Sequence, residues 1–307
     1  MLPSNPSRNT DALNGPPGGG RWGDGCFHVF LDVGANIGVQ TRKLFEPHAY
    51  PAGGSGETIS RRFEGNFSWV RAFESAFGQR RGRNDQRQLC AFGFEASPRH
   101  TKRLQQLQAC YQKQGWRARF FTETAVSDVN GNATFFLTRD QLAASLVRHG
   151  KHRTAPRTHT VSAIDLAAWI DEHVLQRRIP GGGGAEPRVL MKLDIEAAEF
   201  QVLPRMLESG AFCNADRARR VSLLQLEWHL LFLLQRKGKV VRSCESAVDP
   251  AACLRAERCM SDVRTRLANA SGGFSACSQL VEGGDDDTYT LDSKLGLDIA
   301  ACAPPPA

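Results

Sequence analysis

Short apolar runs alternate with amphipathic stretches along most of the chain. The runs that predict buried strands span 28–33, 90–94, 117–122, 189–193 and 221–226. Apolar residues at helical spacing follow three of these runs, over 38–45, 98–114 and 197–209. Because the strands and helices alternate, the pattern predicts an α/β fold in which a parallel sheet carries helices on both faces.

Polar and glycine-rich segments divide this pattern. Residues 1–24 are rich in Pro, Gly and Asn, and we expect them to be disordered. The folded domain then spans 25–292, and a tail covers 293–307. Within the domain, the Gly- and Arg-rich stretch 48–88 is interpreted as an insertion that projects from the sheet, and the polar stretch 139–158 as a loop.

Smaller elements follow from local signals. Within the insertion, 67–77 has the spacing of a helix. Asn130-Gly131 is a strong hairpin signal and predicts that 124–127 pairs with 133–138. The runs 274–280 and 288–291 are expected to close the sheet.

Positive charge is concentrated in one part of the chain. The 307 residues carry a formal net charge of +7, and 61–120 holds 13 basic residues against 4 acidic ones. Such a region suits nucleic acid, anionic polysaccharide or acidic lipid, or is simply a solvated insertion. No apolar run reaches the ~18 residues of a membrane span, and no signal-peptide core precedes residue 24. A cytoplasmic location is therefore the default expectation.

Cysteine usage and sequons keep a second location open, the lumen of the secretory pathway. Four of the nine cysteines lie near the C-terminus, at Cys244, Cys253, Cys259 and Cys277. They contain no C-x-x-C pair, so their spacing disfavours zinc and leaves disulfides or free thiols. The N-x-[ST] sequons begin at Asn66, Asn132 and Asn269.

A glycine-rich turn follows the first predicted strand and opens a helix. The turn reads Asp32-Val33-Gly34-Ala35-Asn36-Ile37-Gly38. Its G-x-x-x-G spacing differs from both the dinucleotide fingerprint and the phosphate loop. A carboxylate beside the turn repels a pyrophosphate but suits a cationic ligand with an amino group, such as S-adenosylmethionine.

An acid ends the second predicted strand, as expected for a group that binds the ribose hydroxyls of a nucleoside. Glu95, followed by Ala96, holds this position, and the insertion accounts for its distance from Gly38. Glu74 ends a similar run and is the competing choice. We favour Glu95 because a helix with clear periodicity follows it.

Four segments together resemble the FkbM family of methyltransferases. In chain order they are DVGANIG, FGFEASP, TAVSDVNGNATFFL and VLMKLDIEAAEFQVL, and they span about 27–227. The resemblance implies a class I methyltransferase fold of the Rossmann-like type. That fold has a seven-stranded, mostly parallel sheet of order 3-2-1-4-5-7-6, in which the seventh strand is antiparallel. It further implies S-adenosylmethionine as the methyl donor and a hydroxyl as the usual acceptor.

The resemblance also implies roles for individual residues. Donor binding falls to the turn and to the residues near ribose and adenine: Asp32, Gly34, Ala35, Asn36, Gly38, Glu95, Ala96, Ser127 and Asp128. The family signature K-x-D-x-E-G-x-E matches Lys192, Asp194, Glu196 and Glu199. Ala197 replaces the glycine of that signature, and we expect it to be tolerated at the start of a helix.

The catalytic candidates lie at the ends of two neighbouring predicted strands. Asp194 and Glu196 follow one strand, and Glu227 and His229 follow the next. We expect His229, with a pKa near 6.5, to be a general base, and Lys192 to orient the substrate. As an alternative, Asp194 and Glu227 could hold Mg²⁺; we favour the metal-free mechanism because two carboxylates are few for this ion.

The function indicated is therefore O-methylation of a sugar or other small molecule. A nucleic-acid methyltransferase that uses 61–120 is the alternative enzyme, although the N/D-P-P-Y/F motif of amino-directed enzymes is absent. A degenerate methyltransferase domain that only binds ligands is the non-enzymatic alternative, and Ala197 is its one support.

Overall fold

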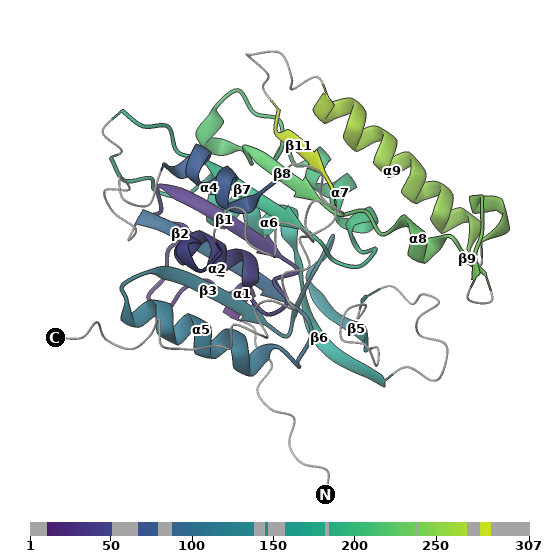
Figure 1. The fold of residues 1–307 in the computed structure, drawn as a ribbon, viewed down its shortest axis with the longest axis horizontal. Coiled ribbons are helices and arrows are strands. Elements are labelled where there is room, and N and C mark those ends of the chain that lie inside the picture. Colours follow the sequence, from purple (N-terminus) through teal and green to yellow (C-terminus); the bar gives the residue numbers. More distant parts are fainter. Residues whose placement is uncertain are drawn as a thin grey trace, which may run out of the picture.

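A six-stranded sheet forms the centre of the computed structural model, which describes residues 11–50, 67–78, 88–137, 145–146, 157–181, 184–236, 239–247, 249–268 and 277–283. The strands, in sheet order, are β11 (Gln279–Glu282), β8 (Leu223–Leu226), β7 (Val189–Leu193), β1 (His28–Val33), β2 (Leu89–Glu95) and β3 (Arg117–Thr122) (Figure 1). Every neighbouring pair is parallel. The α/β fold with a mostly parallel sheet is thus confirmed.

The edge of the sheet differs from the expected seven strands. β11 occupies the position beside β8, where an antiparallel strand was expected, and it runs parallel to β8. The expected closing strand at 288–291 lies outside the described residues. Within the described part of the chain, the sheet therefore has six strands.

Helices cover both faces of the sheet, as predicted. Along β1, Val29, Leu31 and Val33 enter one hydrophobic cluster and Phe30 enters the other, as the alternation of a strand requires. The first cluster includes side chains from α6 (Leu166–Ile170), the π-helical turn η4 (Asp171–Leu175), α7 (Glu199–Glu208) and α9 (Pro250–Ala268). The second includes side chains from α2 (Val39–Phe45), α4 (Trp69–Phe77) and α5 (Thr101–Lys113).

A three-stranded second sheet replaces the predicted hairpin. Its order is β4 (Thr124–Ser127), β6 (Arg157–Asp165) and β5 (Gly131–Leu137). β6 lies between the two strands that Asn130-Gly131 was expected to pair, so that prediction is wrong. The Asn130 side chain instead accepts a hydrogen bond from the Asp165 N–H at 2.7 Å, which anchors the connection to β6.

The segment before β1 belongs to the fold from residue 11 onward. Trp22 packs edge-on against Phe121 at 5.3 Å, and the Trp169 indole donates a hydrogen bond to the Ala12 carbonyl. The expectation of disorder up to residue 24 is therefore wrong for 11–24, because this segment packs against Phe121 of β3 and Trp169 of α6. The remaining short elements are α1 (Asp11–Asn14), η1 (Pro47–Ala49), η5 (Arg217–Arg219), α8 (Leu230–Leu233), β9 (Gln235–Arg236), β10 (Lys239–Val240) and η6 (Cys244–Ser246).

The helix predicted at 67–77 is present, but it is not a surface excursion. Trp69, Phe73 and Phe77 are buried on one face of α4. The Trp69 and Phe73 rings lie 5.0 and 4.8 Å from the ring of Phe30 in β1. The interpretation of 48–88 as an insertion with little to bury is wrong for this helix, whose aromatic residues recur at helical spacing.

Three disulfides join described cysteines: Cys26–Cys90, Cys213–Cys277 and Cys244–Cys253. Of the four C-terminal cysteines, one pair is bonded internally, Cys277 bonds outside the group, and Cys259 is free and buried. These bonds indicate an oxidising environment. Within the described residues, no helix has both the length and the apolar character needed to cross a bilayer.

Trp69→Ala should lower the free energy of unfolding by about 3–5 kcal/mol, because it empties a buried aromatic site. Glu74→Ala changes an exposed residue of the same helix and should stay within about 0.5 kcal/mol of the parent. Urea denaturation of the two variants measures the difference. Equal stabilities would show that α4 is not part of the core. In that case, a variant that lacks residues 50–86 should still fold; if α4 is part of the core, this variant should not.

Candidate functional site

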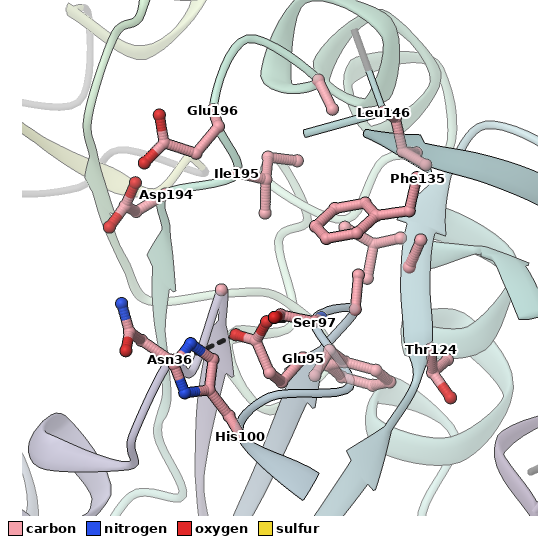
Figure 2. Close-up of a pocket in the computed structure, with 16 residues that line it drawn as sticks. Asn36, Glu95, Ser97, His100, Thr124, Phe135, Leu146, Asp194, Ile195 and Glu196 are labelled. Atoms are coloured by element: carbon pink, nitrogen blue, oxygen red, sulfur yellow. Dashed lines mark hydrogen bonds between the residues drawn. The ribbon is translucent and has the colours of Figure 1, made fainter. Parts of the chain in front are cut away.

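A cavity opens at the carboxyl ends of β1, β2 and β7, where ligands bind in open parallel sheets. Its empty space of about 640 Å³ includes open solvent at the mouth. Its lining combines apolar side chains with a few polar groups, as ligand pockets do. The lining residues are Gly34, Asn36, Phe94, Glu95, Ala96, Ser97, His100, Thr124, Ala125, Val126, Phe135, Leu146, Asp194, Ile195, Glu196 and Ala198. Figure 2 shows Asp194 and Glu196 together on one side and Phe135 and Leu146 on another.

The loop after β1 touches the loop after β7. Gly34 has a φ of 83°, and a Cβ atom there would overlap the carbonyl oxygen of Asp194. Glycine is therefore required for both conformation and space. Lys192, almost fully buried on β7, donates to the Gly34 carbonyl at 2.9 Å and lies 3.1 Å from the Asp194 carboxylate. Lys192 thus fixes the two loops rather than facing the cavity.

Glu95 accepts two backbone hydrogen bonds at the cavity wall. One comes from the Asn36 N–H and the other from the Ser97 N–H, each at 2.7 Å (Figure 2). Burial raises the Glu95 pKa to about 7, although these two bonds and the charge of Lys192 act to lower it. The competing acid, Glu74, is exposed on α4 and does not line the cavity.

The glycine-rich turn contributes only part of its predicted set. Gly34 and Asn36 line the cavity, whereas Asp32, Ala35 and Gly38 do not. Asp32 is fully buried and accepts a hydrogen bond from the Thr41 hydroxyl at 2.9 Å, so it holds the turn to α2. Its predicted direct contact with a ligand is not supported by this placement.

The part of β4 that lines the cavity also differs from the expectation. Ser127 and Asp128 do not line the cavity; their side chains bond to each other, and Gln201 donates to Asp128. The three residues just before them, 124–126, line it instead. A motif match cannot locate the cavity-lining residues of a strand to within one to three positions.

Four carboxylates surround His229. Its Nε2 lies 3.6 Å from Asp194 Oδ1, 3.6 Å from Glu196 Oε2 and 3.7 Å from Glu227 Oε1. On the other side of the ring, Nδ1 lies 3.3 Å from Glu199 Oε1, which also accepts the His229 N–H at 2.7 Å. The structure therefore brings together the acids that the sequence placed at the ends of two strands.

The carboxylates change the acidity of His229. Burial alone would lower its pKa, but the hydrogen bond to Glu199 and the charges of Glu199, Asp194 and Glu196 raise it to about 10. The expectation of a pKa near 6.5 is wrong, and in this arrangement the ring is protonated at neutral pH. A protonated ring cannot accept a proton, so the carboxylates are better placed to do so.

Several cavity residues were not singled out from the sequence. Phe135 comes from β5, whose pairing was mispredicted, and Leu146 from the expected polar loop. His100 follows β2, and burial, together with the charges of Arg103 and Arg99, lowers its pKa to about 4. His100 is thus neutral near neutral pH. Its position five residues after Glu95, at the start of α5, was the sequence signal that could have identified it.

Ala197 occupies a position that favours glycine. Its φ is 77°, in the left-handed region, and the preceding Glu196 has a φ of 55°. The helix α7 begins only at Glu199, so the expectation that Ala197 is a favourable first helical residue is wrong. The turn nevertheless keeps this shape with alanine in place, at a cost of about 1–2 kcal/mol.

Comparisons with known proteins add no assignment: no family model, no curated protein and no solved structure matches this chain. The resemblance to FkbM-family methyltransferases therefore rests on the four sequence segments alone.

Ala197→Gly should raise the free energy of unfolding by up to about 1 kcal/mol. Glycine adopts the left-handed conformation without strain, but it also increases the entropy of the unfolded chain, which cancels part of the gain. Ala256→Gly is the control, since Ala256 lies buried in the interior of α9 and glycine should destabilise the helix there. Thermal and urea unfolding provide the comparison. If both variants lose stability equally, the turn is not strained.

Glu95 should make stability depend on pH. Its pKa rises from 4.5 to about 7 on folding, so the stabilisation is complete below pH 4.5 and is lost as pH rises through 7. Relative to Glu95→Gln, the parent should therefore lose roughly 2–3 kcal/mol between pH 5 and pH 8. Denaturant titrations at both pH values test this, with Glu74→Gln as control. A difference that does not vary with pH would contradict the raised pKa.

Proposed function

We propose that this chain is an S-adenosylmethionine-dependent methyltransferase that methylates a hydroxyl group on a sugar or another small molecule. The observation that carries the proposal is the position of Glu95, hydrogen-bonded to the Asn36 N–H at the carboxyl ends of β1 and β2. There, an acid can accept hydrogen bonds from both ribose hydroxyls of a nucleoside.

The sheet supports the same proposal. When its strands are numbered by chain order, they run 3-2-1-4-5-6, and the first five positions agree with the order that the FkbM resemblance implies. The edge strand β11 is the departure from that order. Because fold alone does not define activity, the argument depends on the cavity and its residues.

The cavity fits the donor in three regions. Glu95 and the backbone around Asn36 suit the ribose, and apolar side chains such as Val126 and Phe135 suit the faces of an adenine ring. Asp194 and Glu196 provide negative charge for an amino group or a sulfonium. When bound, S-adenosylmethionine supplies a methyl group that an oxygen nucleophile can take.

The acid cluster carries out the other half of the chemistry. Asp194, Glu196 and Glu227 are partly exposed, so their carboxylates can approach an acceptor hydroxyl and receive its proton. His229 orients these carboxylates, and Glu199 fixes the His229 ring through contacts with its backbone N–H and its Nδ1. Lys192 keeps Asp194 beside the loop that binds the donor.

A nucleic-acid acceptor is less well supported. Several basic residues of 61–120 serve the fold itself: Arg103 donates to the Ile37 carbonyl, Arg117 donates to the Asp24 carbonyl, and the Arg119 guanidinium lies over the Trp22 ring. These contacts leave fewer cations for phosphate groups. A purely ligand-binding role is disfavoured by the carboxylates gathered beside the cavity, which ligand binding alone does not require.

An oxidising compartment is the environment that we propose for this activity. The disulfide Cys26–Cys90 joins the segment before β1 to the beginning of β2, at the end of these strands opposite the cavity. The sequon at Asn132 is exposed on β5. Both features favour the lumen of the secretory pathway over the cytoplasm. In that lumen, glycan hydroxyls are available as acceptors.

The parent protein should bind S-adenosylmethionine and S-adenosylhomocysteine with micromolar dissociation constants, about −8 kcal/mol. Glu95→Ala should weaken binding by roughly 1–3 kcal/mol, because the ribose loses a charged hydrogen-bond acceptor. Glu74→Ala should bind as the parent does. Isothermal calorimetry with both ligands measures these affinities, and the opposite ranking of the two variants would refute the assignment of the ribose acid.

Methyl transfer is tested with labelled S-adenosylmethionine and a panel of glycans, small alcohols and RNA. The proposal predicts label on a glycan or alcohol. It also predicts a large loss of turnover in Glu227→Gln with donor affinity retained, because Glu227 belongs to the acid cluster but does not line the donor cavity. Label transferred only to RNA would support the alternative acceptor. Donor binding without transfer to any class would support the ligand-binding module.

A further inference from the structure

The cluster around His229 has the composition of a metal site rather than of a simple acid cluster. One imidazole nitrogen and three carboxylates converge, and ligand atoms of Asp194, Glu196 and His229 all lie within 4.8 Å of one another. Glu227 lies at the edge of this group, with its Oε1 3.7 Å from the same imidazole nitrogen. The residues come from the ends of β7 and β8, so the sheet itself sets their spacing.

The distances within the cluster suit a shared ion better than direct hydrogen bonds. Nε2 lies 3.6–3.7 Å from the three carboxylate oxygens, beyond the 2.7–3.2 Å of a normal N–H···O bond. Two ligand atoms, each about 2.1 Å from one ion, are roughly 3.0–3.5 Å apart in octahedral or tetrahedral coordination. A small contraction of these side chains, of which Asp194 and Glu196 line the cavity, would complete the shell.

Glu199 supplies an independent observation. It is fully buried, and its Oε1 accepts the His229 N–H and faces Nδ1, so the ring is held with Nε2 toward the other acids. Its second oxygen, Oε2, is buried and has no hydrogen-bond partner among the described residues. A carboxylate on the far nitrogen of a ligating histidine is the usual outer partner of a metal site.

The charge of the cluster also calls for a cation. Asp194, Glu196, Glu199 and Glu227 are four acids. Lys192, through Asp194 Oδ2, and the protonated His229 ring neutralise two of these charges. The side chain of His229 is only 10 % exposed and that of Asp194 13 %, so solvent screens the remaining charge incompletely. A bound divalent ion would lower this repulsion.

We propose that Asp194, Glu196, Glu227 and His229 bind a divalent transition-metal ion of the Mn²⁺ or Zn²⁺ type, and that His229 releases its Nε2 proton to solvent when the ion binds. The mixed imidazole and carboxylate set favours such ions over Mg²⁺, which prefers oxygen ligands alone. The ion would bind the acceptor hydroxyl and lower its pKa, and the oxygen of the Glu227 carboxylate that does not bind the ion would take the proton. This role, unlike ion binding itself, rests on the proposed methyl transfer.

Mn²⁺ binding to the protein alone tests the site without donor or acceptor. Electron paramagnetic resonance titration should show one Mn²⁺ per chain with a dissociation constant below about 100 µM. Equimolar Zn²⁺ should displace it, whereas Mg²⁺ should require a large excess. Glu196→Gln and Asp194→Asn should each weaken binding at least tenfold, and Glu199→Gln should weaken it 10–100-fold through the orientation of His229.

Glu208→Gln, which changes an exposed acid at the end of α7, is the control and should bind Mn²⁺ as the parent does. Circular dichroism of each variant shows whether it is folded. No binding at 1 mM Mn²⁺, or parent-like binding in folded Glu196→Gln and Asp194→Asn, would overturn the proposal. Because no methyl donor is present, either result leaves the proposed methyltransferase activity to be judged separately.

Discussion

The arrangement of the site depends on one buried ammonium group. Lys192 lies in the middle of the sheet, on β7, and donates to the Gly34 carbonyl of the neighbouring loop while it contacts Asp194 of its own loop. A buried charge of this kind is costly unless it is paired and hydrogen-bonded. Its two partners meet this requirement, and they hold the loop after β1 against the loop after β7 where a side chain on Gly34 would not fit.

This contact links the two halves of the cavity chemically. On the β1 side, Asn36 carries the N–H that Glu95 accepts; on the β7 side, Asp194 and Glu196 begin the acid cluster. The burial that raises the Glu95 pKa therefore occurs at the same site as the charges that raise the His229 pKa. Holding these two groups with shifted pKa values costs folding free energy. Such costs are common where a protein binds or transforms a ligand.

The sequence predicted the parts of the fold that hydrophobic period and strand ends determine. The parallel sheet, the position of Glu95 rather than Glu74 at the cavity, and the gathering of acids after β7 and β8 all follow from that pattern. Contacts between distant segments were not predictable. The hairpin at Asn130 failed because β6 competes for both strands, and the segment around Trp22 is ordered by an aromatic ring far along the chain.

Local chemistry was the other limit of sequence reasoning. A lone histidine has an ordinary pKa until its neighbours are known, and here four carboxylates reverse its expected role. The sequence paired Asp194 with Glu227 as possible metal ligands, whereas the structure brings Glu196 as well to within 4.8 Å of Asp194 and His229. Likewise, the left-handed φ of Ala197 gives a physical reason for a glycine at that position, which the helix-start argument missed.

A crystal structure of the complex with S-adenosylhomocysteine tests the central claim most directly. The account predicts the nucleoside in the cavity at the carboxyl ends of β1 and β2, with both ribose hydroxyls on the Glu95 carboxylate and the sulfur on the side of Asp194 and Glu196. A ligand bound elsewhere, or one in this cavity whose ribose does not contact Glu95, would contradict the account.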